Sequence, residues 1–248
     1  MQPQTSSLAG RVALVTGGSR GIGHAIAAAL LDEGASVVIT GRDQSHLDDA
    51  VKELGGGDSA RADRVYASRA DARNANHAAA AVQAAVDQFG GLDILINNAG
   101  VGLFATVAEM DVQGWHEVID TNLSGVFFFC HAALPRLRAR GGGWIINISS
   151  LAGKNPFATA AAYCASKAGL NAFTEALMME VRQDDIRVSC VMPGSVATGF
   201  GRGGGHGSSD DWKLSPDDIA QVVMDLIAHP ARSLPSRVEI RPSKPLKR

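Results

Sequence analysis

A tyrosine and a lysine stand four residues apart in a segment whose composition predicts a helix. Tyr163 and Lys167 are the first and last residues of the run YCASK, and this spacing puts a phenol and an ammonium group on one helix face. A nearby cation stabilises phenolate, which lowers the pKa of a phenol from its reference value of about 10. A phenol perturbed in this way can exchange a proton near neutral pH. The pair therefore predicts acid–base chemistry, and the chain has only one other tyrosine, Tyr66.

A glycine-rich run lies between the first apolar segment and the first predicted helix. It reads TGGSRGIG over residues 16–23, with Gly17, Gly21 and Gly23. Glycine allows a tight turn and close approach of a ligand to the backbone, and a helix N-terminus offers free N–H groups. The spacing differs from both the G-x-G-x-x-G pattern and the P-loop. The run predicts a phosphate site, and an ordinary glycine turn is the structural alternative.

The residues after the second predicted strand bear on the choice of cofactor. A dinucleotide site often carries an acidic residue there that bonds the ribose hydroxyls. This chain instead has Gly41 followed by Arg42. Together with Arg20 in the glycine-rich run, Arg42 suits a 2′-phosphate, because guanidinium groups bind phosphate well. The two arginines favour NADP(H) over NAD(H), and the alternative is that both are solvated surface side chains.

Short apolar runs alternate with helical segments along the chain, and these elements must position the residues above. Strands are predicted at 12–15, 37–39, 65–67, 92–96, 144–148, 186–192 and 237–240. Helices are predicted at 22–31, 44–54, 74–89, 114–140, 159–183 and 215–228. The alternation predicts an α/β fold, a single-domain doubly wound parallel sheet of Rossmann type with helices on both faces. A TIM barrel is the competing fold, but it needs eight units and the chain has fewer.

Length, composition and charge bound the domain organisation and the partners. The chain has 248 residues, 46% of them hydrophobic, and a formal net charge of −2. One large α/β domain fits this length. Residues 1–10 are predicted as a polar N-terminal arm, 11–241 as the domain, with a mobile substrate loop at about 195–214, and 242–248 as a basic tail. The near-neutral charge offers no basic footprint for nucleic acid and no polybasic membrane patch.

Cysteine usage and the N-terminal segment bear on location. Cys130, Cys164 and Cys190 are widely spaced without a CxxC, which argues against a disulfide framework and a zinc site. The seven histidines are scattered and form no HExxH, so we predict no metal. The first residues lack a cationic region followed by an apolar one, and no apolar run approaches the ~18 residues of a membrane helix. We therefore expect a cytoplasmic protein with a small-molecule substrate and neither nucleic acid nor membrane as a partner.

Six motifs, taken in order, resemble those of the short-chain dehydrogenase/reductase family. They are TGGSRGIG at 16–23, NNAG at 97–100, TNLSG at 121–125, ISS at 148–150, YCASK at 163–167 and PGSVAT at 193–198. The set spans about residues 10–200 and is most similar to the 3-oxoacyl-(acyl carrier protein) reductase-like members. The C-terminal sequence RVEIRPSKP departs from the VDGG-like ending of many members, so the substrate and the assembly do not follow from the resemblance.

The resemblance implies four catalytic residues. Tyr163 is expected to protonate the carbonyl oxygen during reduction and to act as the base in the reverse direction. Lys167 is expected to bind the nicotinamide ribose and to favour the Tyr163 phenolate. Ser150 is expected to hydrogen-bond the substrate oxygen and stabilise its developing charge. Asn122 is expected at a kink in the long helix, holding a water that links Lys167 to solvent, and its alternative is a structural bond to the backbone.

The same resemblance implies a nicotinamide cofactor site. Arg42 is expected to meet the adenosine phosphate, Asp71 the adenine amino group, and Asn98 the adenosine ribose. Val196 and Thr198 are expected to face the nicotinamide carboxamide. The full cofactor set is Gly17, Ser19, Arg20, Gly21, Ile22, Gly23, Arg42, Asp71, Asn98, Tyr163, Lys167, Val196 and Thr198.

These residues predict an NADP(H)-dependent oxidoreductase that interconverts a ketone and a secondary alcohol. One alternative is an NAD-dependent alcohol dehydrogenase of the same family, and another is a non-catalytic NADP-binding redox sensor. An S-adenosylmethionine methyltransferase would share the glycine-rich run but has no use for the Tyr–Lys pair.

Aromatic residues bear on the substrate and on assembly. Phe104, Phe157 and Phe200 predict an apolar lining for a pocket built from 102–106, 151–157 and the loop after Pro193. The run Phe127-Phe128-Phe129 is either a substrate wall or, as we favour, part of a subunit interface. We therefore expect a homo-oligomer, a dimer or a tetramer, assembled through the two long helices.

Overall fold

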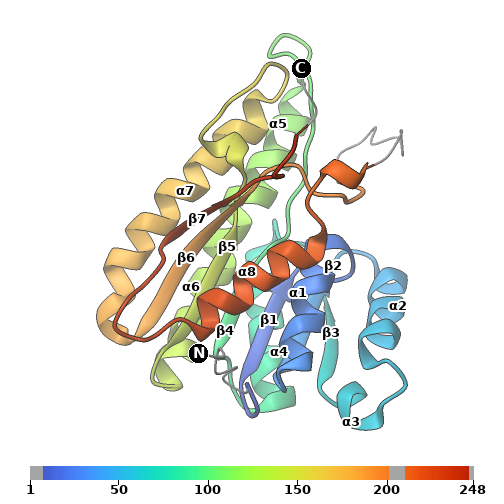
Figure 1. Cartoon of the computed structure of the whole chain (residues 1–248), viewed down its shortest axis with the longest axis vertical. Helices are drawn as coiled ribbons and strands as arrows, with labels where there is room; N and C mark the ends of the chain where they lie inside the picture. Colours follow the sequence, from blue (N-terminus) through green and yellow to red (C-terminus); the bar gives the residue numbers. More distant parts are fainter. Residues whose placement is uncertain (1–7, 201–209, 246–248) are drawn as a thin grey trace.

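Seven parallel strands form one sheet in the order β3-β2-β1-β4-β5-β6-β7 (Figure 1). The structure is a computed structural model, and it describes residues 8–200 and 210–245. The strands are β1 (Val12–Thr16), β2 (Ser36–Gly41), β3 (Val65–Arg69), β4 (Ile94–Asn97), β5 (Gly143–Ile148), β6 (Ile186–Pro193) and β7 (Arg237–Ile240). This order confirms the doubly wound parallel sheet expected from the sequence and is incompatible with a TIM barrel.

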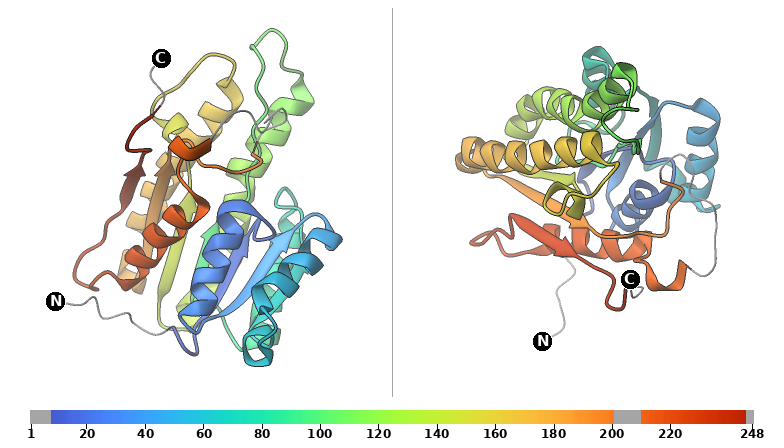
Figure 2. Two further views of the ribbon diagram at one scale, coloured as in Figure 1. Left: turned by 45° about the vertical axis from the view of Figure 1, so that its right-hand side comes forward. Right: turned by 90° about the horizontal axis from the view of Figure 1, so that it is seen from above.

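Helices cover both faces of the sheet, as the two views in Figure 2 show. They are α1 (Gly21–Asp32), α2 (Gln44–Gly55), α3 (Ser59–Ala62), α4 (Ala75–Phe89), α5 (Val112–Ile119), α6 (Gly125–Ala139), α7 (Ala161–Val181) and α8 (Pro216–Ala228). The predicted elements are present with boundaries shifted by a few residues. The four-residue α3 was not predicted, and neither was the 3-10 turn Leu151–Gly153.

The helix predicted at 114–140 is the one element that needs correction. It consists of α5, a π-helical turn over Asp120–Ser124, and α6. The extra residue of a π-helical turn widens the helix locally, a feature that is frequent at functional sites. Here the wider turn contains Asn122, whose buried amide bonds the backbone of Val101 instead of facing solvent.

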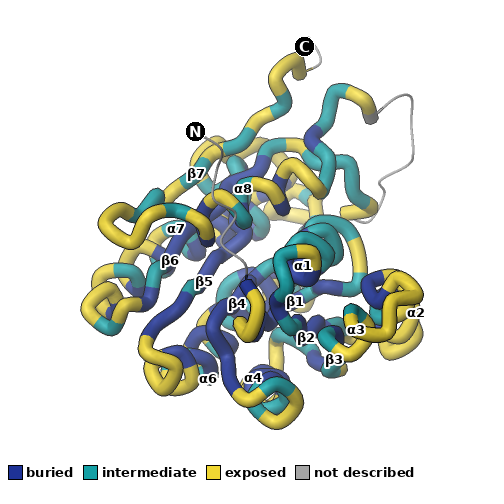
Figure 3. The backbone as a smooth tube through the Cα atoms, turned by 60° about the horizontal axis from the view of Figure 1, so that its bottom comes forward, coloured by how far each residue is buried: buried dark blue, intermediate teal, exposed yellow. Residues whose placement is uncertain are grey.

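Two apolar layers hold the sheet between its helices. On one face, α1, α2 and α8 pack residues such as Ile26, Leu47 and Val223 against the strands. On the other face, α4, α6 and α7 contribute residues such as Val82 and Phe129. Figure 3 shows the central strands as buried, whereas the edge strands β3 and β7 and the connections at the strand ends include exposed residues. Burial on both faces explains why the strand segments are apolar runs rather than alternating patterns.

The strand order reverses between β1 and β4, and this point is where an open α/β sheet binds ligands. The two connections that leave these strands are fastened to each other there. The Thr16 hydroxyl accepts hydrogen bonds from the backbone N–H groups of Asn98 and Ala99, at 2.9 and 3.0 Å. The glycine-rich run and the NNAG motif therefore meet at the carboxyl end of the sheet.

The ends of the predicted domain are only partly described. Leu8 is buried in the core and its N–H donates to Glu33 O, so the predicted polar arm already packs at that residue. Residues 1–7 and 246–248 lie outside the described residues. Of the predicted mobile loop at 195–214, residues 201–209 also lie outside them. Its two described ends are joined by a bridge between Val196 and Leu214.

Asp93 is a fully buried carboxylate at the amino end of β4, with an exposed fraction of 0%. Its oxygens accept hydrogen bonds from Arg11 Nη1 at 2.9 Å, Arg140 Nε at 3.1 Å and Val12 N at 2.9 Å. Burial alone would raise the pKa of Asp93. The hydrogen bonds from Arg140, Val12 and Arg11 outweigh it, and the pKa lies below its usual value.

The Asp93→Asn variant is expected to lower the free energy of unfolding by about 3 kcal/mol at pH 7, because two guanidinium groups lose their shared counter-charge. Since the folded-state pKa is depressed, this stabilisation is present above the unfolded-state pKa of ~3.9 and is lost as pH falls through the folded-state value. Urea denaturation across pH measures both effects.

The matched control is Asp184→Asn, which removes the exposed ion pair with Arg138. An exposed pair is worth ~1 kcal/mol or less. Equal losses of unfolding free energy in the two variants would contradict this stabilising role of Asp93. A loss for Asp93→Asn that persists in acid would contradict it as well.

Candidate active site

The glycine-rich run forms a tight loop that leaves a helix N-terminus open. Gly17 and Gly21 have φ angles of +66° and +57°, which favour glycine. A Cβ on Gly23 would lie 2.3 Å from the Gly17 carbonyl oxygen, so this position excludes a side chain. Among the described residues, the N-cap residue Arg20 makes no side-chain bond to the first turn of α1, and that turn holds no acid. The backbone N–H groups in the first turn of α1 are therefore available to an anion, and the loop fits a cofactor phosphate.

Two other connections border this loop. The Asn98 amide donates to the carbonyl oxygens of Thr16 and Gly17 at 3.0 and 3.1 Å, so it clamps the glycine loop to β4. On the opposite side, a Cβ on Gly21 would lie 3.3 Å from Thr198 Cγ2. Three regions far apart in sequence therefore meet at one end of the sheet, as expected for a single binding crevice.

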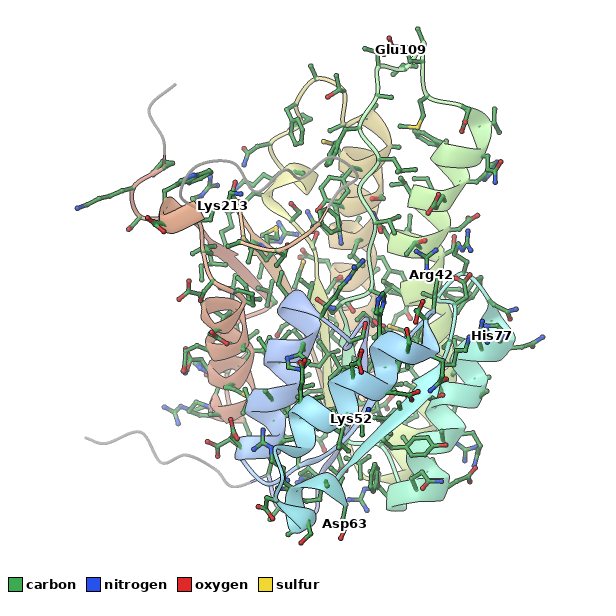
Figure 4. The ribbon with its side chains drawn as sticks, turned by 90° about the vertical axis from the view of Figure 1, so that its right-hand side faces the viewer. Arg42, Lys52, Asp63, His77, Glu109 and Lys213 are labelled. Carbon is green, nitrogen blue, oxygen red and sulfur yellow. The ribbon has the colours of Figure 1, made fainter. Side chains whose placement is uncertain are left out.

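Arg42 lies at the end of β2, and its side chain is 56% exposed (Figure 4). Its nearest carboxylate is Glu117 on α5, at 4.0 Å. A guanidinium group with so loose a partner is able to take a phosphate instead. Glu117 was not singled out in the sequence, because only the fold brings α5 beside the end of β2.

Asp71 follows β3 in the same corner, but its carboxylate is already engaged. Arg73 binds it through Nη2 at 2.6 Å and Nε at 3.0 Å. Hydrogen bonding from Arg73 is the main cause that holds the pKa of Asp71 below its usual value, and the charge of Arg42 adds to it. The predicted contact of Asp71 with an adenine amino group thus stays a prediction, and it requires Asp71 to share its oxygens with Arg73.

The four predicted catalytic residues gather beyond the ends of β4 and β5. The Lys167 ammonium donates to the Ile148 carbonyl at 2.9 Å and lies 5.9 Å from the centre of the Tyr163 ring. Ser150 caps the 3-10 turn by accepting from Ala152 N at 3.1 Å, and its hydroxyl is close enough to the Tyr163 phenol to lower the pKa of that group. The i, i+4 spacing of the pair on α7 does bring phenol and ammonium to one face.

Asn122 is fully buried, and its amide is occupied by protein groups. Its Nδ2 donates to Val101 O at 2.9 Å and to Ser166 Oγ at 3.0 Å, while its Oδ1 accepts from Val101 N at 2.8 Å. These bonds agree with the structural alternative for its side chain. A Cβ on Gly100 would lie 3.3 Å from Asn122 Oδ1 and 3.7 Å from Lys167 Nζ, so Gly100 keeps the space between them open. A water contact by Asn122 stays a prediction.

The electrostatics of the pair differ from the sequence prediction of a lowered phenol pKa. Burial raises the pKa of Tyr163, and the hydrogen bond from Ser150 only partly opposes it. The cause is burial, which penalises phenolate, and the Lys167 ammonium, 5.9 Å from the ring centre, does not offset it. Burial also lowers the pKa of Lys167 to about 8. Burial thus shifts both groups toward their neutral forms, but with a pKa of about 8 Lys167 is still mainly an ammonium group at pH 7. A neutral phenol is the form that can donate a proton.

The buried Lys167 should destabilise the folded protein, and the Lys167→Met variant tests this. Its folded-state pKa of about 8 lies below the unfolded value of ~10.4, so the charged form is penalised by roughly 1–3 kcal/mol at pH 7. We expect Lys167→Met to be more stable than wild type by that amount at pH 7. The difference should shrink as pH rises from about 8 to 10, because wild type then gains stability. Urea denaturation at several pH values measures it, and a variant that is less stable at every pH would contradict it.

Asn171 lies on α7 next to the candidate site, and it was not identified from the sequence. It lies one helical turn after Lys167, and its Oδ1 accepts from Ser149 Oγ at 2.6 Å and Cys190 Sγ at 3.3 Å. This ties α7 to the ends of β5 and β6. The only sequence signal is its i+4 spacing from Lys167, which does not distinguish it from other polar residues on the helix.

Two further observations concern the described part of the chain. Within 8–200 and 210–245, the helices are too short or too polar to cross a membrane. In the same ranges, no group of three or more His, Cys, Asp and Glu side chains could hold a metal ion.

The glycine loop at the strand-order reversal fits a phosphate, and Ser150, Tyr163 and Lys167 lie beyond the ends of the neighbouring strands, an arrangement suited to a nucleotide-dependent enzyme of the α/β class. The family model described as short chain dehydrogenase matches residues 11–205. The chain belongs to this family, and it is a dehydrogenase/reductase enzyme that uses a nicotinamide cofactor.

Known proteins are similar over nearly the whole chain. An uncharacterised oxidoreductase of Staphylococcus saprophyticus is 34% identical over 236 residues, which covers 94% of this chain and 97% of the relative. A metagenomic short-chain oxidoreductase, solved with NADP, is 39% identical with a TM-score of 0.82, covering 96% of this chain and 100% of its own. An alcohol dehydrogenase of the archaeon Thermococcus sibiricus, solved with 5-hydroxy-NADP, is 28% identical with a TM-score of 0.85, covering 96% and 99%.

Proposed function

We propose that the protein is an NADP(H)-dependent oxidoreductase that interconverts a ketone and a secondary alcohol. The observation that carries the proposal is the half-buried Tyr163, whose ring centre lies 5.9 Å from Lys167 Nζ, on a sheet whose glycine loop fits a phosphate. A proton donor beside a nucleotide site is the arrangement that carbonyl reduction requires.

The cofactor preference rests on the basic residues of the crevice. The N–H groups at the start of α1 would hold the pyrophosphate, and Arg42 with Arg20 would bind a 2′-phosphate. The other predicted cofactor contacts are Gly17, Ser19, Gly21, Ile22, Gly23, Asp71, Asn98, Val196 and Thr198. When bound, the nicotinamide supplies or accepts the hydride. Two similar structures were solved with NADP or a derivative of it, which supports NADP(H) here, and NAD(H) is the alternative.

The chain's own residues would handle the proton and the developing charge. In reduction, Tyr163 Oη holds the proton that passes to the carbonyl oxygen, and its raised pKa keeps it protonated beforehand. The Ser150 hydroxyl would donate to the same oxygen and stabilise its negative charge. Once Tyr163 has lost its proton, the adjacent Lys167 ammonium would stabilise the phenolate. In alcohol oxidation, the same groups would act in reverse.

A turnover assay tests this function. The purified protein is incubated with NADPH and a panel of ketones, and with NADP⁺ and the matching alcohols, and the products are identified. We expect ketones to yield secondary alcohols with consumption of NADPH. Binding of NADPH without turnover of any ketone or alcohol would favour the redox-sensor alternative.

We also propose that the enzyme is a homo-oligomer through its long helices. The predicted phenylalanine run divides between two roles. Phe129 belongs to the core, whereas Phe127 is exposed on α6 and stacks near Phe128 and His131. An exposed aromatic group on a long helix is suited to contact a second copy. Comparing the sedimentation of wild type and Phe127→Glu would show whether the subunits contact each other through this face of α6.

A further inference from the structure

Three phenylalanine rings form a group at the Tyr163 phenol, two of them in contact with its ring. The Phe104 ring centre lies 5.8 Å from that of Tyr163 in an edge-on arrangement, and the Phe200 ring centre lies 5.7 Å from it. Phe157 extends the group, 6.1 Å from Phe104. Two aromatic rings therefore contact the Tyr163 ring, and a third ring stands next to one of them.

These rings reach the site from three different connections and remain largely open to solvent. Phe104 follows β4, Phe157 follows β5 and Phe200 follows β6, and all three connections extend beyond the carboxyl ends of the strands (Figure 1). Their exposed fractions are 45%, 51% and 43%. Single exposed apolar residues are common on protein surfaces. Three that converge on one catalytic group form a contiguous apolar surface, which is the mark of a binding site.

Gly102 allows two of the rings to approach the backbone. A Cβ at this position would lie 2.7 Å from Phe200 Cε1 and 3.1 Å from Phe104 Cζ. Any side chain larger than hydrogen would push the two rings away from their present positions. Gly102 thus leaves the space beside the backbone that these two exposed rings occupy.

We propose that Phe104, Phe157 and Phe200 form a subsite for an aromatic substituent next to the substrate's carbonyl group. This proposal rests on the proposed function, because it assigns a substrate class to the same site. An aryl group packed edge-on or offset against these rings would be stabilised in two ways, by burial of its apolar surface and by the favourable interaction between aromatic rings. Its carbonyl oxygen would then lie near Tyr163, which Phe104 and Phe200 contact.

The reaction is then reduction of an aryl ketone to a benzylic secondary alcohol. A hydride from NADPH forms the new C–H bond at the carbonyl carbon. The C=O π pair moves to oxygen, which takes the proton of Tyr163, and NADP⁺ leaves. Solvent returns a proton to Tyr163, so two electrons and two hydrogens are accounted for.

The first test compares ketones that differ in their substituent. Acetophenone, 2-butanone and acetoacetate represent an aryl, a small aliphatic and a charged ketone. We expect kcat/KM for acetophenone to exceed that for 2-butanone and for acetoacetate by about 100-fold or more, as burial of a whole ring is worth more than one methylene. A higher kcat/KM for either of the other two would overturn the subsite while leaving the proposed reductase function intact.

The second test removes one ring. Phe104→Ala is expected to lower kcat/KM for acetophenone by about 10- to 100-fold, mainly through KM. For 2-butanone, which places no ring against Phe104, the loss should be several-fold smaller, and NADPH affinity should be unchanged. Phe104→Leu keeps an apolar group without the ring, folds without a large cavity, and should give an intermediate loss. Equal losses for both ketones would overturn the proposal.

A control and a binding measurement complete the design. Tyr66 is an exposed aromatic residue on the edge strand β3, and Tyr66→Ala should leave both ketone activities unchanged. If wild type binds NADPH but reduces no ketone, the proposed function fails. Calorimetric titration of the NADPH-loaded protein with acetophenone then decides the subsite separately. Weaker binding by Phe104→Ala is the expected result, and equal binding would overturn the proposal.

Discussion

The Tyr163→Phe variant is expected to lose about 10³-fold in kcat for ketone reduction, while its Kd for NADPH changes by less than about 3-fold. The substitution removes one hydroxyl, the group that would hold the transferable proton. The ring keeps its contacts with Phe104 and Phe200, so the site should stay folded. Steady-state kinetics and a fluorescence titration with NADPH measure the two quantities.

The matched control is Tyr66→Phe, which removes the other phenol of the chain from an exposed position on β3. It should retain wild-type activity. A Tyr163→Phe enzyme that keeps more than about a tenth of wild-type kcat would contradict the proton-transfer role, since general acid catalysis contributes at least ~10²-fold.

The Arg42→Ala variant is expected to raise the Kd for NADPH by about 10- to 100-fold, the worth of one charged hydrogen bond to a phosphate. The Kd for NADH, which lacks the 2′-phosphate, should change by less than about 3-fold. The side chain is mostly exposed and only loosely paired with Glu117, so the fold should not suffer. The effect on NADPH should also weaken as salt concentration rises, because exposed charges are screened.

Arg138→Ala is a suitable comparison, because Arg138 is an exposed arginine paired with Asp184 on a different part of the molecule. It should alter neither affinity. If Arg42→Ala weakened NADPH and NADH equally, Arg42 would have a packing role and the preference for NADP(H) would lose its main support.

The sheet and its helices were predictable because their signals are local. The run VALV of β1 is wholly apolar, and Ile186–Pro193 is apolar except at Arg187 and Ser189, as expected for parallel strands buried on both faces. The cap Ser215 and the following Pro216 marked the start of α8, and the structure has that capping box. In contrast, the π-helical turn at Asn122 depends on a bond to Val101, more than twenty residues away in the sequence.

The sequence predicted where the candidate site residues lie relative to one another, but not the direction in which the pKa of Tyr163 is shifted. The spacing of Tyr163 and Lys167 correctly placed both groups on one face of α7. Their pKa values depend on how deeply tertiary packing buries them, and that changed the predicted direction for Tyr163. Asn171 was missed for the same reason, since its partners Ser149 and Cys190 come from β5 and β6.

The most direct test of NADP(H) dependence is a side-by-side fluorescence titration of the wild-type protein with NADPH and NADH. An open helix N-terminus with Arg20 and Arg42 beside it predicts that NADPH binds at least ~10-fold more tightly. Tighter binding of NADH would contradict the cofactor assignment and favour the NAD-dependent alternative. Binding of neither would contradict the assignment of the glycine loop as the cofactor site.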